Sequence, residues 1–398
     1  MEYGKKFSSI SPSPTLSIDA KFKKMKQDGI DVVGFGAGEP DFDTPQHIKQ
    51  AAIDAINRGF TKYTPASGTL ELKKAVCEKF KRDNNLDYEP SQIVISNGAK
   101  HSLVNVFGAI LNPGDEVIIP SPFWVSYPEM VKLNDGVVKV LETTEETDFK
   151  FTPQMLKDAI TPKTKALVLN SPSNPTGMIY SKEELMEIAD FCVKHNIFVV
   201  SDEIYEHLIY GGKEHVSIAS LNDKIKDLTI VVNGVSKTYA MTGWRIGYTA
   251  SNKEIAKIMA NVQSHATSNP NSIAQAAAVA AILGPNDEVE KMRKVFEERR
   301  NYMVERINSI EGVSCKMPDG AFYVMMNIKN LLGKEYFGVK VNTCDEFAEL
   351  FLEKGNVAVV PGSGFGACGY LRWSYATSLE NIKMGLDRLE KFLKEGAR

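Results

Sequence analysis

The chain has 398 residues, with 47 basic and 50 acidic side chains and a net charge of −3. This balance gives no basic footprint for a nucleic acid, and 43% hydrophobic residues suit a globular chain of two or three domains. The sequence shows neither a membrane-spanning apolar stretch nor the apolar region of a signal peptide. Five widely spaced cysteines without a CxxC pair favour a reducing, cytoplasmic compartment and argue against a disulfide framework or a zinc site.

The first 45 residues are expected to form an N-terminal arm and part of a small domain. Residues Phe7–Thr15 lack any period and carry two prolines, which predicts an extended segment. A helix is expected around Ile18–Gln27, followed by a short strand at Asp31–Phe35.

From about Gln92 onward, short continuous apolar runs recur with helical patterns between them. Such runs are typical of strands that are buried on both faces of a parallel sheet. One of the helices, Ser181–His195, opens with the spacing of a capping box. The alternation predicts a doubly wound, mostly parallel α/β domain. The expected strands are Ile93–Ile95, Val117–Ile119, Ala166–Leu169, Ile197–Val200, Ile230–Val232 and Ile246–Tyr248.

The dipeptide Gly284-Pro285 ends this pattern. A long amphipathic helix is expected over Asp287–Ile310 and a closing helix over Leu379–Leu393, with three strands between them, at Ala321–Met326, Val357–Val360 and Tyr370–Ser374. This part is predicted to be a smaller α+β domain packed with the N-terminal arm. The expected division is 1–45 for the arm and part of the small domain, 46–285 for the large domain and 286–398 for the small domain.

Polar side chains follow the predicted strands, at the edge where open α/β sheets bind ligands. The turn Ser96–Lys100 consists of small residues and leads into a helix, an arrangement that can hold a phosphate through free amides and the helix dipole. Asn174 lies in a polar turn after Ala166–Leu169. Asp202 follows Ile197–Val200 directly, where a carboxylate is costly unless it is paired.

Lys237 follows the next run, and a lysine at the mouth of a buried sheet can carry a depressed pKa and act as an amine nucleophile. Trp124 places an aromatic plate after another strand, and Arg245 suits a phosphate. Each residue alone also has a purely structural interpretation. Together they are what pyridoxal phosphate needs, because this aldehyde forms a Schiff base with a lysine and needs an acidic partner for its ring nitrogen.

At this point the residues resemble the fold-type I aminotransferases of the class I and II family. The matching motifs run in the family's order along nearly the whole chain. Their exact amino-acid sequences resemble those of the bacterial class Ib aspartate aminotransferase subgroup. The motifs are GEPDF (38–42), YTPASG (63–68), SNPTG (173–177), SDEIY (201–205), SK (236–237), GWRIG (243–247) and LRWS (371–374). The resemblance implies a fold-type I pyridoxal-phosphate-dependent transferase with a large and a small domain.

The resemblance implies three catalytic residues. Lys237 would carry the cofactor covalently and then serve as the proton-transfer base. Asp202 would pair with the ring nitrogen of the cofactor and keep it protonated. Tyr205, together with Asn174, would hydrogen-bond the phenolic oxygen of the ring, and Trp124 would stack on the ring face.

The resemblance also implies how phosphate and substrate are held. The backbone amides of Gly98 and Ala99, Ser236 and Arg245 would hold the phosphate. Tyr63 would reach the cofactor of the partner subunit, which implies a homodimer with shared active sites. For the substrate, Arg372 would bind the α-carboxylate, and Gly38 would leave room where a side chain would clash. Trp124 and Asn174 would also line the substrate site.

One stretch departs from the better-known aspartate aminotransferases, in which an arginine of the other subunit binds the distal carboxylate of the substrate. Residues 264–272 contain no arginine. The class Ib enzymes also lack this arginine and place a lysine after the phosphate turn, which is Lys100 here. Lys100 is therefore expected to bind the distal carboxylate, with Ser13 and Thr15 of the arm as helpers.

The resemblance thus implies transfer of an amino group from L-aspartate to 2-oxoglutarate with ping-pong kinetics. The partners would be amino acids and 2-oxo acids, without a metal, a membrane or a nucleic acid. A prephenate, aromatic or alanine-type aminotransferase on the same scaffold stays an alternative. A β-lyase or an aminocyclopropane-carboxylate synthase would share the lysine, aspartate and arginine. A transcription regulator is disfavoured, because the motifs begin at residue 38 and leave no room for a DNA-binding segment.

Overall fold

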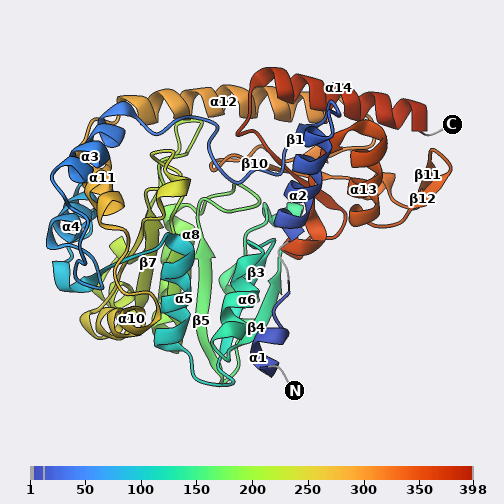
Figure 1. Cartoon of the computed structure of the whole chain (residues 1–398). Helices are drawn as coiled ribbons and strands as arrows, with labels where there is room; N and C mark the ends of the chain where they lie inside the picture. The colour runs from blue at the N-terminus through green and yellow to red at the C-terminus, as the bar shows by residue number, and fades with distance from the viewer. Residues whose placement is uncertain (1–3, 12–13, 397–398) are drawn as a thin grey trace.

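The computed structural model describes residues 4–11 and 14–396 and has two lobes (Figure 1). The large lobe is built on a seven-stranded sheet and the small lobe on a four-stranded sheet. The long helix α12 (Asp287–Asn308) runs along one side of both lobes. Among the described residues, no helix combines the length and the apolar character needed to cross a membrane.

The seven-stranded sheet has the order β2-β8-β7-β6-β5-β3-β4 and is parallel except for β8, which runs antiparallel to both of its neighbours. Its strands are β2 (Ile93–Ser96), β3 (Glu116–Ser121), β4 (Val137–Glu142), β5 (Thr164–Asn170), β6 (Phe198–Asp202), β7 (Thr229–Gly234) and β8 (Gly247–Ala250). The expected doubly wound, mostly parallel sheet is confirmed, although the predicted run Ile246–Tyr248 forms the one reversed strand.

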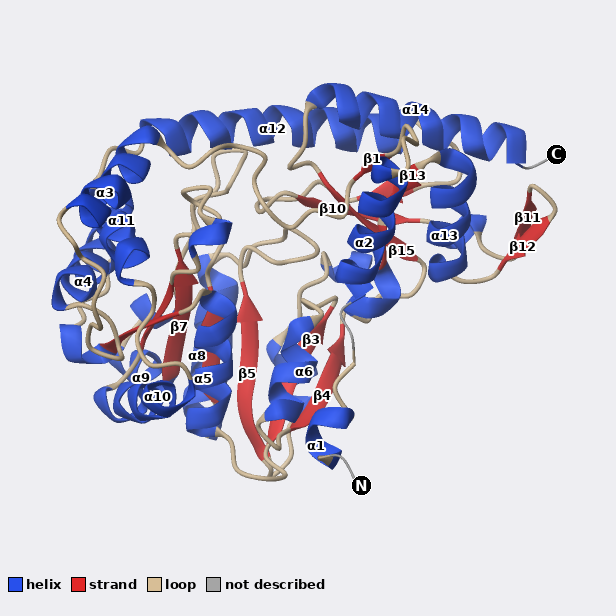
Figure 2. Ribbon diagram, viewed as in Figure 1, coloured by secondary structure: helices blue, strands red, loops and turns tan. Residues whose placement is uncertain are grey.

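Helices cover both faces of this sheet (Figure 2). Along β5, Val168 packs into the apolar cluster under α5, α6 and α10, whereas Leu167 and Leu169 pack into the cluster under α7, α8 and α9. This alternation explains why the middle of the strand, Ala166–Leu169, is apolar at every position. The helices of the large lobe are α3 (Gln46–Asn57), α4 (Leu70–Asn84), α5 (Ala99–Ile110), α6 (Ser126–Leu133), α7 (Pro153–Ala159), α8 (Lys182–His195), α9 (Asp223–Leu228), α10 (Lys253–Ala266) and α11 (Ser272–Leu283).

The small lobe has the sheet order β14-β15-β10-β9, and the N-terminal segment joins it through β1, which pairs in parallel with β13. Its elements are α2 (Pro14–Gln27), β1 (Val33–Gly34), β9 (Ser314–Cys315), β10 (Tyr323–Asn327), β11 (Lys334–Tyr336), β12 (Val339–Val341), α13 (Cys344–Gly355), β13 (Val357–Ala358), β14 (Val360–Pro361), β15 (Tyr370–Ser374) and α14 (Leu379–Gly396). The segment from α2 to β1 thus packs with the C-terminal part, whereas residues 5–8 lie against α6 of the large lobe. The domain boundaries at residues 45 and 285 stay predictions.

Two expectations for local structure were wrong. The arm is not extended, because α1 (Lys5–Ser8) and the first residues of α2 are helical. Pro14 begins α2, a position where the missing N–H of proline costs nothing. The strand β4 was missed because it lies at the sheet edge and mixes exposed and half-buried residues instead of forming an apolar run.

A segment after β6, residues 203–217, links the two lobes and is called the connector below. The amide of Ala321 donates to the carbonyl of Leu208 at 2.9 Å, and the amide of Tyr210 donates to the carbonyl of Asp319 at 2.9 Å. These bonds place the connector beside the start of β10. Because the connector begins directly after Asp202, the end of β6 is tied to the small lobe.

Two buried carboxylates fix the connector to the large lobe, and Glu203 is the first. The hydroxyls of Ser201 and Ser217 donate to Glu203 Oε1 at 2.8 and 2.7 Å. His215 Nε2 lies 3.1 Å from Glu203 Oε2, and both side chains are buried. These contacts hold both ends of the connector against β6.

Glu206 is the second buried carboxylate. It forms an ion pair with Lys79 of α4 and accepts hydrogen bonds from Asn84 Nδ2 at 2.9 Å and from Asn233 Nδ2 of β7 at 2.7 Å. Burial alone would raise the pKa of Glu206, but Lys79, His207 and His215 together outweigh burial and hold the pKa down to about 2. Glu206 therefore joins α4, the connector and β7 as an anion.

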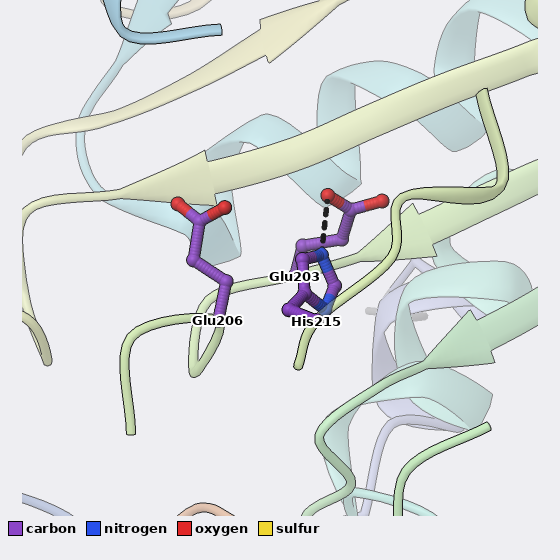
Figure 3. A group of neighbouring side chains, drawn as sticks. All are labelled: Glu203, Glu206 and His215. Carbon is purple, nitrogen blue, oxygen red and sulfur yellow. Dashed lines mark hydrogen bonds and ion pairs between the residues drawn. The ribbon is translucent and has the colours of Figure 1, made fainter. Parts of the chain in front are cut away.

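Glu203, Glu206 and His215 are neighbours (Figure 3). Each offers a possible ligand atom, and these atoms lie within 4.8 Å of one another, a spacing that a metal ion could bridge. The oxygens already accept hydrogen bonds from hydroxyls and amides, and the Lys79 ammonium neutralises the Glu206 charge. The donors that surround these carboxylates are those of a structural network, so we assign the group to the anchoring of the connector.

Replacing Lys79 by Met is expected to lower the free energy of unfolding by about 3–5 kcal/mol, because it leaves the Glu206 carboxylate buried without its cation. The control Lys21→Met removes an exposed ion pair with Glu349 and should cost at most about 1 kcal/mol. Urea titration of both variants against the parent protein measures the two losses. Equal losses would show that the buried pair does not stabilise the connector.

Candidate active site

A cavity of about 460 Å³ lies where the carboxyl ends of the parallel strands face the small lobe. Eleven of the residues expected at the site line it together: Gly38, Ala99, Lys100, Trp124, Asn174, Asp202, Tyr205, Ser236, Lys237, Arg245 and Arg372. They come from segments spread over more than 300 positions of the chain. The expected grouping at one edge of the sheet is therefore what the structure has.

Lys237 lies in the turn after β7, and its Nζ donates a 2.5 Å hydrogen bond to the carbonyl of Gly38. Burial lowers the pKa of the Lys237 ammonium to about 8, and the positive charges of Arg245 and Arg372 act in the same direction. The negative charges of Glu39 and Asp202 oppose this shift. The Lys237 ammonium thus loses its proton far more readily than that of an ordinary lysine.

Asp202 ends β6 and is 3% exposed. Burial raises the pKa of its carboxyl to about 6, although hydrogen bonds from the Tyr127 hydroxyl, at 2.7 Å, and from the amide of Ile204, at 3.3 Å, favour the anion. A cationic group entering the cavity beside Asp202 would therefore gain both a charge partner and a hydrogen-bond acceptor.

Arg372 of β15 is 2% exposed and reaches the cavity from the small lobe. Its Nη1 donates to Asn174 Oδ1 at 3.1 Å and its Nη2 donates to the carbonyl of Gly36 at 3.0 Å. The guanidinium lies 4.4 Å from the ring centroid of Tyr323. Its Nε is buried and has no hydrogen-bond partner in the described part of the chain, so the guanidinium retains a donor for an incoming carboxylate.

Arg245 reaches the same edge through the reversal of β8. Gly247, the first residue of β8, pairs with Ser96 and with Gly234, so the residues just before β8 lie beside the ends of β2 and β7. Gly98 has φ = +84° and caps α5. A Cβ added to Gly98 would lie 2.4 Å from Arg245 Nη2. The glycine thus lets a guanidinium reach the first amides of a helix, which together favour an anion.

Lys100 and Trp124 form another wall, with Lys100 Nζ 4.9 Å from the indole centroid of Trp124. Partial burial lowers the pKa of Lys100, and the charge of Arg245 adds to this effect. Lys100 is exposed as a whole, and it lines the cavity from the first turn of α5 with its ammonium over the Trp124 ring.

The other expected residues are Tyr63, Ser13, Thr15 and Gly98. Tyr63 is 92% exposed and stands away from the cavity of its own chain. Ser13 lies outside the described residues, and Thr15 belongs to α2, but its side chain is not among those described. Gly98 borders the cavity through its contact with Arg245.

The comparisons with known proteins agree with this geometry. The family described as aminotransferase class I and II matches residues 30–389. The chain belongs to this family.

An aspartate aminotransferase of Bacillus subtilis is 52% identical to this aminotransferase over 99% of the chain and the whole relative. A probable aspartate/prephenate aminotransferase of Aquifex aeolicus is 47% identical over 98% of both chains. The crystal structure of an aspartate aminotransferase from Rhizobium meliloti superposes with a TM-score of 0.96, at 45% identity and full coverage of both chains.

Family membership implies pyridoxal phosphate as the cofactor, and the cavity of this aminotransferase fits it. The cofactor's phosphate matches the cradle of Gly98, Arg245 and the start of α5. Its cationic ring nitrogen matches the buried Asp202 carboxylate, and its aldehyde matches a lysine whose ammonium loses its proton more readily than that of an ordinary lysine. The residues present thus suit all three reactive parts of the group.

The sequence analysis missed two hydroxyls of this aminotransferase that contact its key residues. Tyr127 donates to Asp202, and Tyr323 lies 3.0 Å from the hydroxyl of Tyr205. Tyr127 lies three residues after Trp124, on the first turn of α6, so its position after β3 was a usable signal. Tyr323 comes from β10 of the other lobe, and only the packing of the two lobes reveals its role. Lys23 and Glu39 also line the cavity and were not expected there.

Replacing Asp202 by Asn is expected to stabilise the cofactor-free protein more at pH 7 than at pH 5. The folded pKa of about 6 lies above the ordinary aspartate value of 3.8, so the folded protein retains a proton that the unfolded chain loses. The contribution of Asp202 to stability is therefore full below about pH 4 and is lost as the pH rises through 6.

The Asn variant cannot lose this proton. Its advantage over the parent in the free energy of unfolding should grow by about 1 kcal/mol from pH 5 to pH 7 in urea titrations. Asp190→Asn, at an exposed position of α8, serves as the control and should show no such growth. A constant difference between the Asp202 variant and the parent would contradict the raised pKa.

Proposed function

We propose that this aminotransferase moves an amino group from L-aspartate to 2-oxoglutarate, giving oxaloacetate and L-glutamate with ping-pong kinetics. The main observation behind this proposal is that two cationic side chains line the same cavity as a buried lysine amine. Arg372 and Lys100 line the same cavity as Lys237, and so offer partners for the two carboxylates of a dicarboxylic amino acid. The names of close relatives, which include aspartate aminotransferases, support this substrate class.

When bound, pyridoxal phosphate supplies an electron sink for the bonds at the α carbon of the amino acid. We propose that Lys237 holds the cofactor covalently and that its freed Nζ then takes the proton from the α carbon of the donor. The depressed pKa of Lys237 supports this role, because a base works best near the operating pH. Asp202, held by Tyr127, would keep the ring nitrogen protonated.

The remaining side chains would orient the reactants. Arg372 would bind the α-carboxylate as a fork, since two of its nitrogens are already fixed by Asn174 and Gly36. Asn174 and Tyr205 would donate to the phenolic oxygen of the cofactor, and Trp124 would cover its ring. Ser236, Arg245 and the amides of Gly98 and Ala99 would hold the phosphate.

We further propose that the enzyme is a cytoplasmic homodimer with shared active sites. Arg245 lines both the cavity and an adjoining open groove, so on a single chain the phosphate site remains open on that side. The 92% exposure of Tyr63 is what a side chain that enters a partner's site would have. All five cysteines are unpaired, which suits a reducing compartment.

A second candidate function is amino transfer to prephenate on the same scaffold. It is favoured by relatives at 47% and 45% identity whose names include aspartate/prephenate aminotransferase. The same two cations would suit it, because prephenate also carries two carboxylates.

Adding excess L-aspartate without an oxo acid to the cofactor-loaded protein is expected to release one equivalent of oxaloacetate per site. The visible absorbance of the loaded protein should change in step. Adding 2-oxoglutarate should restore the spectrum and yield L-glutamate. Lys237→Ala should retain cofactor affinity but lose turnover by at least about 10³-fold, because base and attachment point disappear together. A loaded protein that ignores aspartate but accepts prephenate as the oxo acid with another donor would favour the second candidate.

Replacing Lys100 by Ala is expected to lower kcat/KM for L-aspartate by about 10–100-fold, the loss typical of a charged hydrogen bond. The value for L-alanine, which has no distal carboxylate, should change by less than about twofold. Lys100→Arg retains the charge and should keep most of the activity toward aspartate. Equal losses for aspartate and alanine would place the distal-carboxylate contact elsewhere.

A further inference from the structure

Tyr323 stands at the meeting point of the two lobes inside the cavity. It is the first residue of β10, is 1% exposed and comes from the small lobe. Its hydroxyl oxygen lies 3.0 Å from that of Tyr205, which comes from the connector of the large lobe. A Cβ added to Gly38 would lie 3.3 Å from the Tyr323 hydroxyl, so this oxygen is also at the cavity wall.

The ring of Tyr323 has a second partner. The guanidinium carbon of Arg372 lies 4.4 Å from the Tyr323 ring centroid, and the ring of Phe365 lies 4.9 Å from the same carbon. Contact with two aromatic rings restricts the orientation of the guanidinium, which favours a bidentate carboxylate contact. Tyr323 therefore contacts both Arg372, which would bind the α-carboxylate, and Tyr205, which would donate to the phenolic oxygen.

The hydrogen bond between the two tyrosines has a direction that matters. Burial raises the pKa of both phenols, so both hydroxyls stay protonated. Only one of the two protons can lie between the oxygens. If Tyr323 donates, Tyr205 is free to direct its own proton into the cavity, and a hydroxyl that accepts a hydrogen bond is also the stronger donor.

We propose that Tyr323 is a positioning residue that donates to Tyr205, directs the Tyr205 proton at the cofactor oxygen and couples this contact to the substrate fork of Arg372. The inference rests on the proposed function. Asn174 provides the parallel link, because it contacts Arg372 directly and shares the proposed oxygen with Tyr205. The two donors to the cofactor oxygen are thus both connected to the group that binds the substrate.

The variant Tyr323→Phe separates the two parts of this role, since it removes the hydroxyl and keeps the ring beside Arg372. In the cofactor-loaded protein, the pKa read from the visible absorbance should rise by about 0.5–1 unit, as expected for one weakened hydrogen bond. The kcat for L-aspartate should fall about 5–10-fold with KM changed by less than about twofold. Tyr323→Leu also removes the ring and should raise KM in addition.

Tyr375→Phe is the matched control. The Tyr375 hydroxyl is equally buried in the same core and donates to the carbonyl of Ala321 at 3.2 Å, away from the cavity. This variant should lower the thermal midpoint by a similar amount without moving the absorbance titration. A purely structural role of Tyr323 predicts the same behaviour for Tyr323→Phe.

The outcomes distinguish the inference from the proposed function. A parent protein that binds the cofactor without a titrating absorbance, or that fails to transaminate, overturns both. A parent that titrates and transaminates, with Tyr323→Phe titrating identically, overturns the inference alone. A shift in Tyr323→Phe that Tyr375→Phe reproduces also overturns it, whereas a shift confined to Tyr323→Phe supports it.

Discussion

Charge buried at the carboxyl edge of the seven-stranded sheet is the constraint on which the rest of the structure depends. Asp202, Lys237 and Arg372 share one cavity, and burial displaces the pKa of each of them toward the neutral form. Without a ligand, the cavity therefore disfavours its own charges. A ligand that brings a cation to Asp202 and anions to the two basic residues favours their charged forms again. The buried charges thus lower the free energy of unfolding of the free protein and raise its affinity for such a ligand.

The scaffold keeps this cavity in place with contacts that never reach it. Glu203 and Glu206 fix the connector and do not line the cavity. Glu206 also accepts a hydrogen bond from Asn233 of β7, four residues before Lys237. The connector that follows Asp202 and the strand that precedes Lys237 are thus both tied by Glu206 to α4, through Lys79. Relative placement of the acid and the amine does not depend on the sheet hydrogen bonds alone.

Most of the fold could be predicted because the sheet is buried on both faces. Runs such as Ile230–Val232 are apolar throughout, and the polar residues that follow them mark the ligand edge. The run at β8 gave no sign of its direction, since a buried strand is apolar whether it is parallel or reversed. The edge strand β4 pairs with β3 alone and exposes three of its six residues, and Lys139 interrupts its apolar residues, so the apolar-run pattern fails there.

At the site, the charged residues could be predicted from the sequence, and the tyrosines that contact them could not. Asp202 and Lys237 stand out because a charge directly after a buried strand is rare. Tyr127 and Tyr323 do not stand out, because tyrosines are common in protein cores. Their roles depend on the hydrogen-bond partner of each hydroxyl, which the sequence does not show. Tyr323 in particular is separated from Tyr205 by 118 positions and a lobe boundary, a contact that local sequence patterns do not encode.

The N-terminal segment has a mechanical consequence. Helix α2 packs on β1, β13 and β14 of the small lobe, while residues 36–39, which follow β1, line the cavity together with Lys23 of α2. One wall of the cavity is therefore attached to the small lobe. Any rotation of the small lobe relative to the large lobe therefore moves this wall and the guanidinium of Arg372 together, as one rigid body. The width of the cavity entrance and the position of the carboxylate-binding arginine would then change together.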